Sequence, residues 1–156
     1  MKMFLAALAV STALTGPGFA HAASVTMTTT LNNYYGPDAY LAYYLTDPNG
    51  NYAGSLWLSG RKARYYGSLI GWARATRGDL SEVNGLTGAS VGSGRTMSVT
   101  VDIADALFDA GYQLHVDAAA ENMPSSPNEI VVPLTSAGSG QTVPGRHYIA
   151  DFSYSK

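Results

Sequence analysis

The stretch AYLAYYLTDPNGNYAGSLWL, residues 39–58, decides the fold of this chain. Its first part, Ala39–Thr46, is apolar and rich in tyrosine, a composition that favours a β-strand. Asp47–Gly50 follows as a strong turn, because its proline presets φ and its glycine accepts the left-handed conformation. Tyr52–Leu58 then returns as an apolar partner strand. We therefore predict a β-hairpin at this point.

Alternation of apolar and polar residues with period two recurs on both sides of the hairpin. One segment differs: Leu69 and Trp72 lie at helical spacing, which predicts a short helix over Arg64–Ala75. Ile103–Asp109 is open between a helical turn and a loop. About seven short strands with one helix predict an all-β chain, an immunoglobulin-like antiparallel β-sandwich. Besides the hairpin, the predicted strands span 25–31, 97–101, 112–118, 129–134 and 147–154.

The N-terminal residues have the order of a secretory signal peptide. Lys2 supplies a positive charge, Met3–Thr15 is uncharged and mostly apolar, and Gly16–Gly18 breaks any helix. Ala20–Ala22 then has the small-x-small pattern that signal peptidase reads, which predicts cleavage after Ala22, with Ala23 as the alternative. The apolar run is too short to span a bilayer as an anchor.

We therefore expect residues 1–22 to be removed and residues 23–156 to remain as a single periplasmic β-sandwich domain, since no linker or repeat divides them. No second apolar run could span a membrane. The absence of cysteine excludes disulfides, a lipoprotein anchor, thiolate metal sites and iron–sulfur clusters. The formal net charge of −2 argues against nucleic acid as a partner.

Common catalytic and metal-binding patterns are missing from the sequence. His115 and His147 lie on separate predicted strands, and neither has a partner at metal-ligand spacing. Asp102, Asp105 and Asp109 do not meet calcium-loop spacing and are typical of turn carboxylates. We therefore predict no metal site, and we rank a hydrolytic or metalloenzyme low because no nucleophile–base pair or ligand cluster can be named.

One segment could carry chemistry: Asn84–Ser90, NGLTGAS. It resembles the acceptor motif of the secreted flavin transferases, Asp-Gly-x-(Ser/Thr)-Gly-Ala-(Thr/Ser), whose last residue receives FMN from FAD as a phosphoester. The resemblance implies covalent FMN on Ser90. Two positions depart from the motif, since Asn84 stands where Asp is usual and Ser90 where Thr is commoner. The alternative interpretation is a flexible loop of small residues.

A basic and aromatic segment, Trp57–Arg77, precedes this motif. Its aromatic faces could stack on a flavin ring, and its cations could meet the FMN phosphate. The alternatives are a solvated charged face and a hydrophobic plug at one end of the sandwich. The candidate cofactor-binding residues are therefore Asn84, Thr87, Gly88, Ala89 and Ser90 in the motif, and Arg64, Tyr65 and Trp72 in the segment before it.

The chain as a whole resembles a periplasmic family, the domain of unknown function numbered 2271, over residues 24–155. The matching features are the tyrosine-rich strand with its Asp-x-x-Gly turn, Leu56-Trp57, Arg64-Tyr65 and Thr87–Ser90. The loop after Ile103 departs from the family's usual Trp-Asp-Gly-containing loop. Members of the family tend to occur beside PepSY-type membrane proteins and flavin transferases, in settings linked to iron acquisition and electron transfer.

Two hypotheses follow. The first is a periplasmic redox carrier with FMN on Ser90, loaded by a flavin transferase and supplied with electrons by a PepSY-type inner-membrane reductase, as the resemblance implies. Such a protein transfers electrons rather than turning over a substrate. The second is a non-catalytic binding or accessory protein of a metal or siderophore uptake system. It is motivated by the tyrosine-dense strand, since tyrosine is favoured at binding surfaces.

Overall fold

The computed structural model describes residues 21–156, so the predicted signal peptide, residues 1–22, lies outside the described residues except for its last two. In this part of the chain no helix is long and apolar enough to cross a membrane. The strands are β1 (Ala22–Leu31), β2 (Ala39–Thr46), β3 (Tyr52–Ser59), β4 (Thr87–Gly88), β5 (Thr96–Ala104), β6 (Gln113–Ala120), β7 (Ser126–Pro133), β8 (Thr142–Pro144) and β9 (Ile149–Ser155). The helical segments are η1 (Ala63–Ser68), α2 (Ile70–Thr76), η2 (Leu80–Val83) and η3 (Asp105–Leu107).

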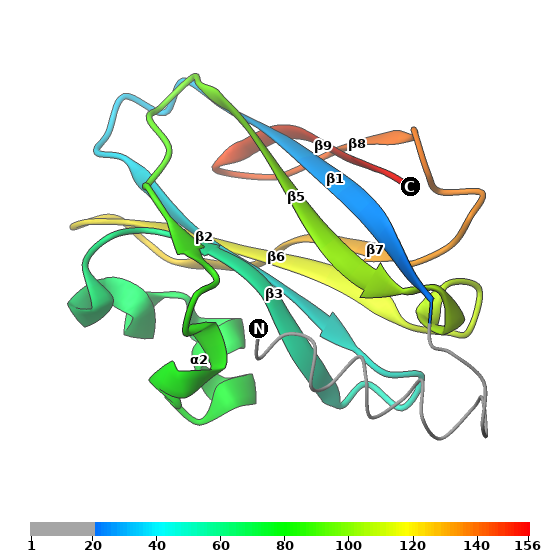
Figure 1. Ribbon diagram of the computed structural model, residues 1–156. Helices are drawn as coiled ribbons and strands as arrows, with labels where there is room; N and C mark the ends of the chain where they lie inside the picture. The colour runs from blue at the N-terminus through cyan, green and yellow to red at the C-terminus, as the bar shows by residue number, and fades with distance from the viewer. Residues whose placement is uncertain (1–20) are drawn as a thin grey trace.

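The strands form two sheets packed face to face, with η1, α2 and η2 on the outer side of one of them (Figure 1). The four-stranded sheet has the order β5-β1-β9-β8, and the five-stranded sheet has the order β4-β3-β2-β6-β7. Every pairing is antiparallel except that of β3 with β4. The predicted sandwich of immunoglobulin-like type is confirmed. Two strands beyond the expected number, β4 and β8, are too short to show a periodicity of their own.

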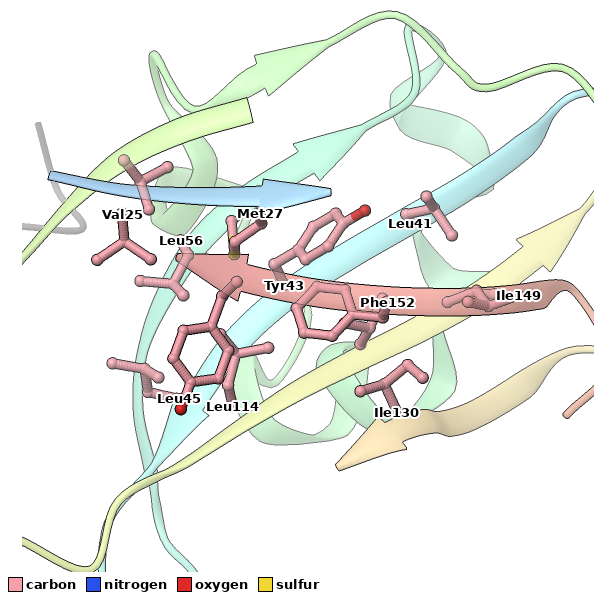
Figure 2. Packing of buried hydrophobic residues seen from close by; sticks show 14 of the residues in the cluster. Val25, Met27, Leu41, Tyr43, Leu45, Leu56, Leu114, Ile130, Ile149 and Phe152 are labelled. Atoms are coloured by element: carbon pink, nitrogen blue, oxygen red, sulfur yellow. The ribbon is translucent and has the colours of Figure 1, made fainter. Parts of the chain in front are cut away.

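The main core lies between the sheets (Figure 2). On β1 the side chains alternate, so that Val25 and Met27 are buried while Thr26 and Thr28 face outward. Tyr43 of β2 is fully buried in this core, and its hydroxyl shares a hydrogen bond of 2.8 Å with Thr29. Burial raises the pKa of Tyr43, so its hydroxyl stays protonated and keeps a partner in the interior. Phe152 of β9 packs beside this ring.

The outer face of the five-stranded sheet is also covered, which makes β2 buried on both faces. The cover is not the single helix predicted over Arg64–Ala75. It consists of η1 and α2, separated at Leu69, whose φ of −82° and ψ of 73° are not helical. Leu69 is fully buried against the sheet, together with Tyr66 and Trp72. Just after the break the Trp72 N–H donates to the Asp117 carboxylate of β6. Tertiary contacts therefore override the helical spacing here.

A buried carboxylate fixes α2 on the sheet. Asp117 of β6 accepts hydrogen bonds from the backbone N–H groups of Trp72, at 2.6 Å, and Asn128, at 2.8 Å. The Tyr44 hydroxyl donates a third, at 3.3 Å. Gly71 allows this close approach, since a Cβ there would lie 2.6 Å from the Asp117 Oδ2. The carboxylate therefore joins β2, β6, β7 and the covering layer.

The segment left open between a helical turn and a loop contains both strand and helix. Strand β5 continues to Ala104, and the 3₁₀ turn η3 follows. The aspartates there act as turn and surface carboxylates, as predicted. Asp105 pairs with Lys156 at 3.2 Å, and Asp109 accepts hydrogen bonds from the backbone N–H and the hydroxyl of Ser136.

Candidate functional site

A groove of about 800 Å³ opens between the two sheets where their edge strands β4 and β5 lie on the same side of the sandwich. Such a volume falls within the roughly 300–1,000 Å³ typical of small-molecule sites. Both sheets contribute to its walls. Its lining includes Trp57 and Ser59 of β3, Gly88–Gly92, Arg95, and Met97 of β5.

The second half of the NGLTGAS motif forms one wall of this groove, and it is held rather than loose. Thr87 and Gly88 pair in parallel with Leu58 and Ser59 at the end of β3. On the other side, Val91 exchanges two backbone hydrogen bonds with Ala39, of 2.7 and 3.0 Å. Ser90 therefore lies between two backbone attachments to the five-stranded sheet.

The Ser90 hydroxyl has a carboxylate partner that the sequence did not reveal. It donates a hydrogen bond of 3.0 Å to the Oδ2 of Asp38, which also lines the groove. Ser90 is half-buried and Asp38 is exposed. The two residues are far apart in the sequence, and only the bridge between Ala39 and Val91 brings them together. No spacing pattern could have signalled this pair.

The ring of Trp57 stands against the motif. Tyr43 pairs with Trp57 and Tyr44 with Ser55, so Leu56 is an extra residue that forms a β-bulge. Strict alternation would place Leu56 and Trp57 on opposite faces, but both pack against the core between the sheets. The bulge therefore aims the indole into the groove.

Neighbouring side chains hold this indole in place. Its Nε1 donates to the Ser59 Oγ at 3.2 Å, and the Ser59 hydroxyl donates to the Met97 Sδ at 2.9 Å. Gly88 lies directly against the ring, because a Cβ at that position would be 2.6 Å from the Trp57 Cζ2. The glycine of the motif is therefore the residue that the Trp57 ring requires.

Arg95 is the cation of the groove lining. Its guanidinium makes no hydrogen bond or ion pair within the residues that the structure describes, and it is exposed. Gly92 separates it from the carboxylate. A Cβ on Gly92 would lie 3.1 Å from the Arg95 Cγ and 3.6 Å from the Asp38 Oδ1. A hydroxyl, a carboxylate and an unpaired guanidinium therefore gather around Ser90–Gly92.

The other predicted site residues lie elsewhere. Trp72 is 1 % exposed in the layer that covers the five-stranded sheet, and its Nε1 donates to Ser55 at 2.9 Å. Tyr65 belongs to the same layer and donates to Glu121, while the guanidinium of Arg64 lies 4.9 Å from the centre of its ring. None of Arg64, Tyr65 and Trp72 lines the groove. Their expected part in cofactor binding stays a prediction without support from their position.

Within the motif, the structure brings Gly88, Ala89 and Ser90 to the groove. Thr87 and Asn84 are exposed and do not line it. No sequence pattern singled out Asp38 or Arg95. Trp57 stood out only as part of the basic and aromatic segment and of the family resemblance.

Neither a metal cluster nor a catalytic histidine accompanies this groove. Among residues 21–156 no group of three or more histidines or acidic residues could hold a metal ion. His115 stacks on Tyr44 with ring centres 5.0 Å apart, and its nitrogens bond to Thr46 and Asn128. These contacts give His115 a packing role on the covered face of the sheet.

A family model described as a predicted periplasmic protein (DUF2271) matches residues 22–151. The chain belongs to this family. The match agrees with the predicted resemblance and with the predicted periplasmic location. No curated protein and no solved structure matches this DUF2271 protein.

Proposed function

We propose that this DUF2271 protein is a periplasmic redox carrier that holds FMN covalently on Ser90. The observation that supports the proposal is the position of the Ser90 hydroxyl. It stands at the wall of a groove of about 800 Å³, which Arg95, whose guanidinium is unpaired, and Trp57 also line. The hydroxyl that the acceptor motif would modify therefore has room for a large planar group next to it.

The residues of the groove fit the chemistry of FMN. The half-buried indole of Trp57 offers an aromatic face to a flavin ring, and Met97 and Val99 add apolar contact from the opposite sheet. Arg95 supplies a positive charge for the phosphoester, because a guanidinium without a protein partner can bind phosphate oxygens. Polar residues, among them Asp38, Ser59 and Arg95, line the groove together with these apolar ones, so the groove offers both hydrogen-bond partners and apolar contact.

Bound FMN would supply redox chemistry, while the chain would orient the ring and limit its access to water. Both tasks suit this site. Trp57 is fixed by Ser59 and Gly88, and Ser90 is fixed by the strand pairing on either side. The open side of the groove would leave one edge of the ring accessible to a redox partner. We propose a PepSY-type inner-membrane reductase as that partner and iron acquisition as the setting, on the family resemblance alone.

The test is co-expression of the exported chain with a secreted flavin transferase, followed by intact-mass analysis. We expect a yellow protein with a single FMN phosphoester, and no label on Ser90→Ala. Ser98→Ala is the matched control and should keep the label, because it removes another serine hydroxyl of the groove lining that lies outside the motif. A colourless wild-type protein, or a labelled Ser90→Ala variant, would refute the proposal.

The alternative of a binding or accessory protein finds little support in the tyrosine-dense strand. Tyr40, Tyr43 and Tyr44 are all buried, and their side chains pack in the two cores. Tyr35, before the strand, is exposed by 88 % but stands at a turn with a positive φ of 54°. The tyrosines of β2 therefore stabilise the sandwich and present no binding surface.

A further inference from the structure

The contact between Ser90 and Asp38 is the feature of the groove that has a chemical role still to assign. Asp38 immediately precedes Ala39, and Ser90 immediately precedes Val91, the two residues of the isolated bridge. Two backbone hydrogen bonds, of 2.7 and 3.0 Å, hold that bridge together. Because the bridge is antiparallel, Asp38 lies opposite Gly92, and Ser90 is its diagonal neighbour on the same face. The backbone pairing therefore places the carboxylate and the hydroxyl within hydrogen-bond reach of each other.

The direction of the hydrogen bond matters for reactivity. An ionised carboxylate has no proton to donate, so the Ser90 Oγ donates to the Asp38 Oδ2, at 3.0 Å. A serine hydroxyl is a weak nucleophile unless a base within hydrogen-bond reach can take its proton. Such reach is about 2.6–3.2 Å between heavy atoms, and this pair satisfies it. Asp38 is thus placed to act on the atom that must attack phosphorus.

We propose that Asp38 is the proton acceptor for Ser90 when flavin is transferred to it, an inference that rests on the proposed function. In this step the Ser90 Oγ forms a bond to the FMN-side phosphorus of FAD. The bond from that phosphorus to the bridging oxygen breaks, and its electron pair leaves with AMP. The Ser90 proton passes to Asp38 and from there to solvent. Nothing is oxidised or reduced, and FAD and a flavin transferase are the co-reactants.

Arg95 can offset the repulsion between Asp38 and the phosphates of FAD. A carboxylate beside the acceptor hydroxyl repels the phosphates of FAD, which by itself would slow the transfer. Arg95 and Asp38 both lie next to Gly92, and the Arg95 guanidinium has no partner among the described residues. A guanidinium there can bind the incoming phosphate oxygens and offset the repulsion. Carboxylate, hydroxyl and cation together make a site for phosphoryl transfer onto Ser90.

The experiment measures the initial rate of FMN transfer to purified chain, produced in the periplasm of a host without a flavin transferase. FAD and one purified transferase are added, and intact mass follows the product. Asp38→Asn is the decisive variant, because its amide oxygen can still accept the Ser90 hydrogen bond but is not a base. The matched control is Asp102→Asn, which removes the same charge from an exposed site on β5 outside the groove.

We expect Asp38→Asn to lower the rate by on the order of 100-fold, the low end for loss of a general base. Asp102→Asn should react at the wild-type rate, and Asp38→Glu should recover part of the loss. The ratio of wild-type to Asp38→Asn rates should fall as the pH rises, because hydroxide replaces the missing base. This ratio cancels the transferase's own pH dependence, and a merely structural role would leave it constant.

Three results would overturn the inference, and they are distinguishable. If wild type is labelled and Asp38→Asn is labelled equally fast or faster, Asp38 is not the proton acceptor while the proposed function stands. If wild type takes up no FMN, the proposed function fails and this inference fails with it. Thermal unfolding of each variant shows whether a slow rate comes from a damaged fold. If Asp38→Asn unfolds like wild type and reacts slowly, but the ratio of wild-type to variant rates stays constant with pH, the inference is also wrong.

Discussion

The contact between Gly88 and the Trp57 ring yields a quantitative prediction. In Gly88→Ala the new methyl group would lie 2.6 Å from the Trp57 Cζ2, well inside van der Waals contact. The ring cannot simply turn away, because its Nε1 is hydrogen-bonded to Ser59, which is itself fully buried. Overpacking of this kind costs about 1–3 kcal/mol. The loss of unfolded-state entropy that accompanies a Gly-to-Ala change offsets about 0.4–1 kcal/mol of it.

The free energy of unfolding of Gly88→Ala should therefore fall by roughly 1–2 kcal/mol. Urea unfolding followed by tryptophan fluorescence measures this directly, and the emission of the folded state should also change as the indole shifts. Gly67→Ala is the matched control. No heavy atom lies within 4 Å of its new methyl group, so it should gain about 0.4–1 kcal/mol. Equal or greater stability of Gly88→Ala relative to wild type would refute the packing argument.

Two further predictions concern carboxylates outside the groove. Asp117→Ala removes the acceptor of the Trp72 and Asn128 backbone N–H groups, so the free energy of unfolding should fall by about 3 kcal/mol or more. Hydrogen exchange should show that the amides of α2 lose protection first. Unchanged protection in α2 would contradict the anchoring role of Asp117. Hydrogen bonds from the Ser136 hydroxyl and backbone N–H hold the pKa of Asp109 below its ordinary value of 3.8. These two bonds therefore stabilise the fold above that pH, and their contribution is lost as the pH falls through the lowered pKa. The stability difference between wild type and Ser136→Ala should accordingly be largest near neutral pH and shrink in acid titrations below about pH 4, and a difference that grows in acid would contradict the assignment.

Several parts of the fold could be predicted from the sequence because they depend on neighbours along the chain. The hairpin of β2 and β3 follows from two apolar strands around a Pro-and-Gly turn, and both strands lie within a residue of the expected bounds. The sandwich follows from alternation, which reports whether a strand has a buried face. The NGLTGAS motif was visible for the same reason, since its residues are consecutive.

Other parts could not be predicted because local patterns do not report bulges or the choice of pairing partner. A single extra residue, Leu56, aims Trp57 toward the groove, whereas alternation would have turned it away. The helical spacing of Leu69 and Trp72 predicted one helix, but the structure has η1 and α2 with a break at Leu69, just after which the Trp72 N–H donates to Asp117. Trp72 is buried in the covering layer and is therefore out of reach of a ligand at the surface.

By itself, the sequence determined that this chain is an all-β sandwich of a periplasmic family, with Ser90 at the acceptor position of a flavin-acceptor-like motif. Only the tertiary structure decided what surrounds that hydroxyl. The bridge between Ala39 and Val91 places Asp38 against Ser90, although a long stretch of chain separates them. Periodicity records how each residue prefers to be buried, while the contacts of a site depend on which strands meet, and that is settled by the packing of the whole chain.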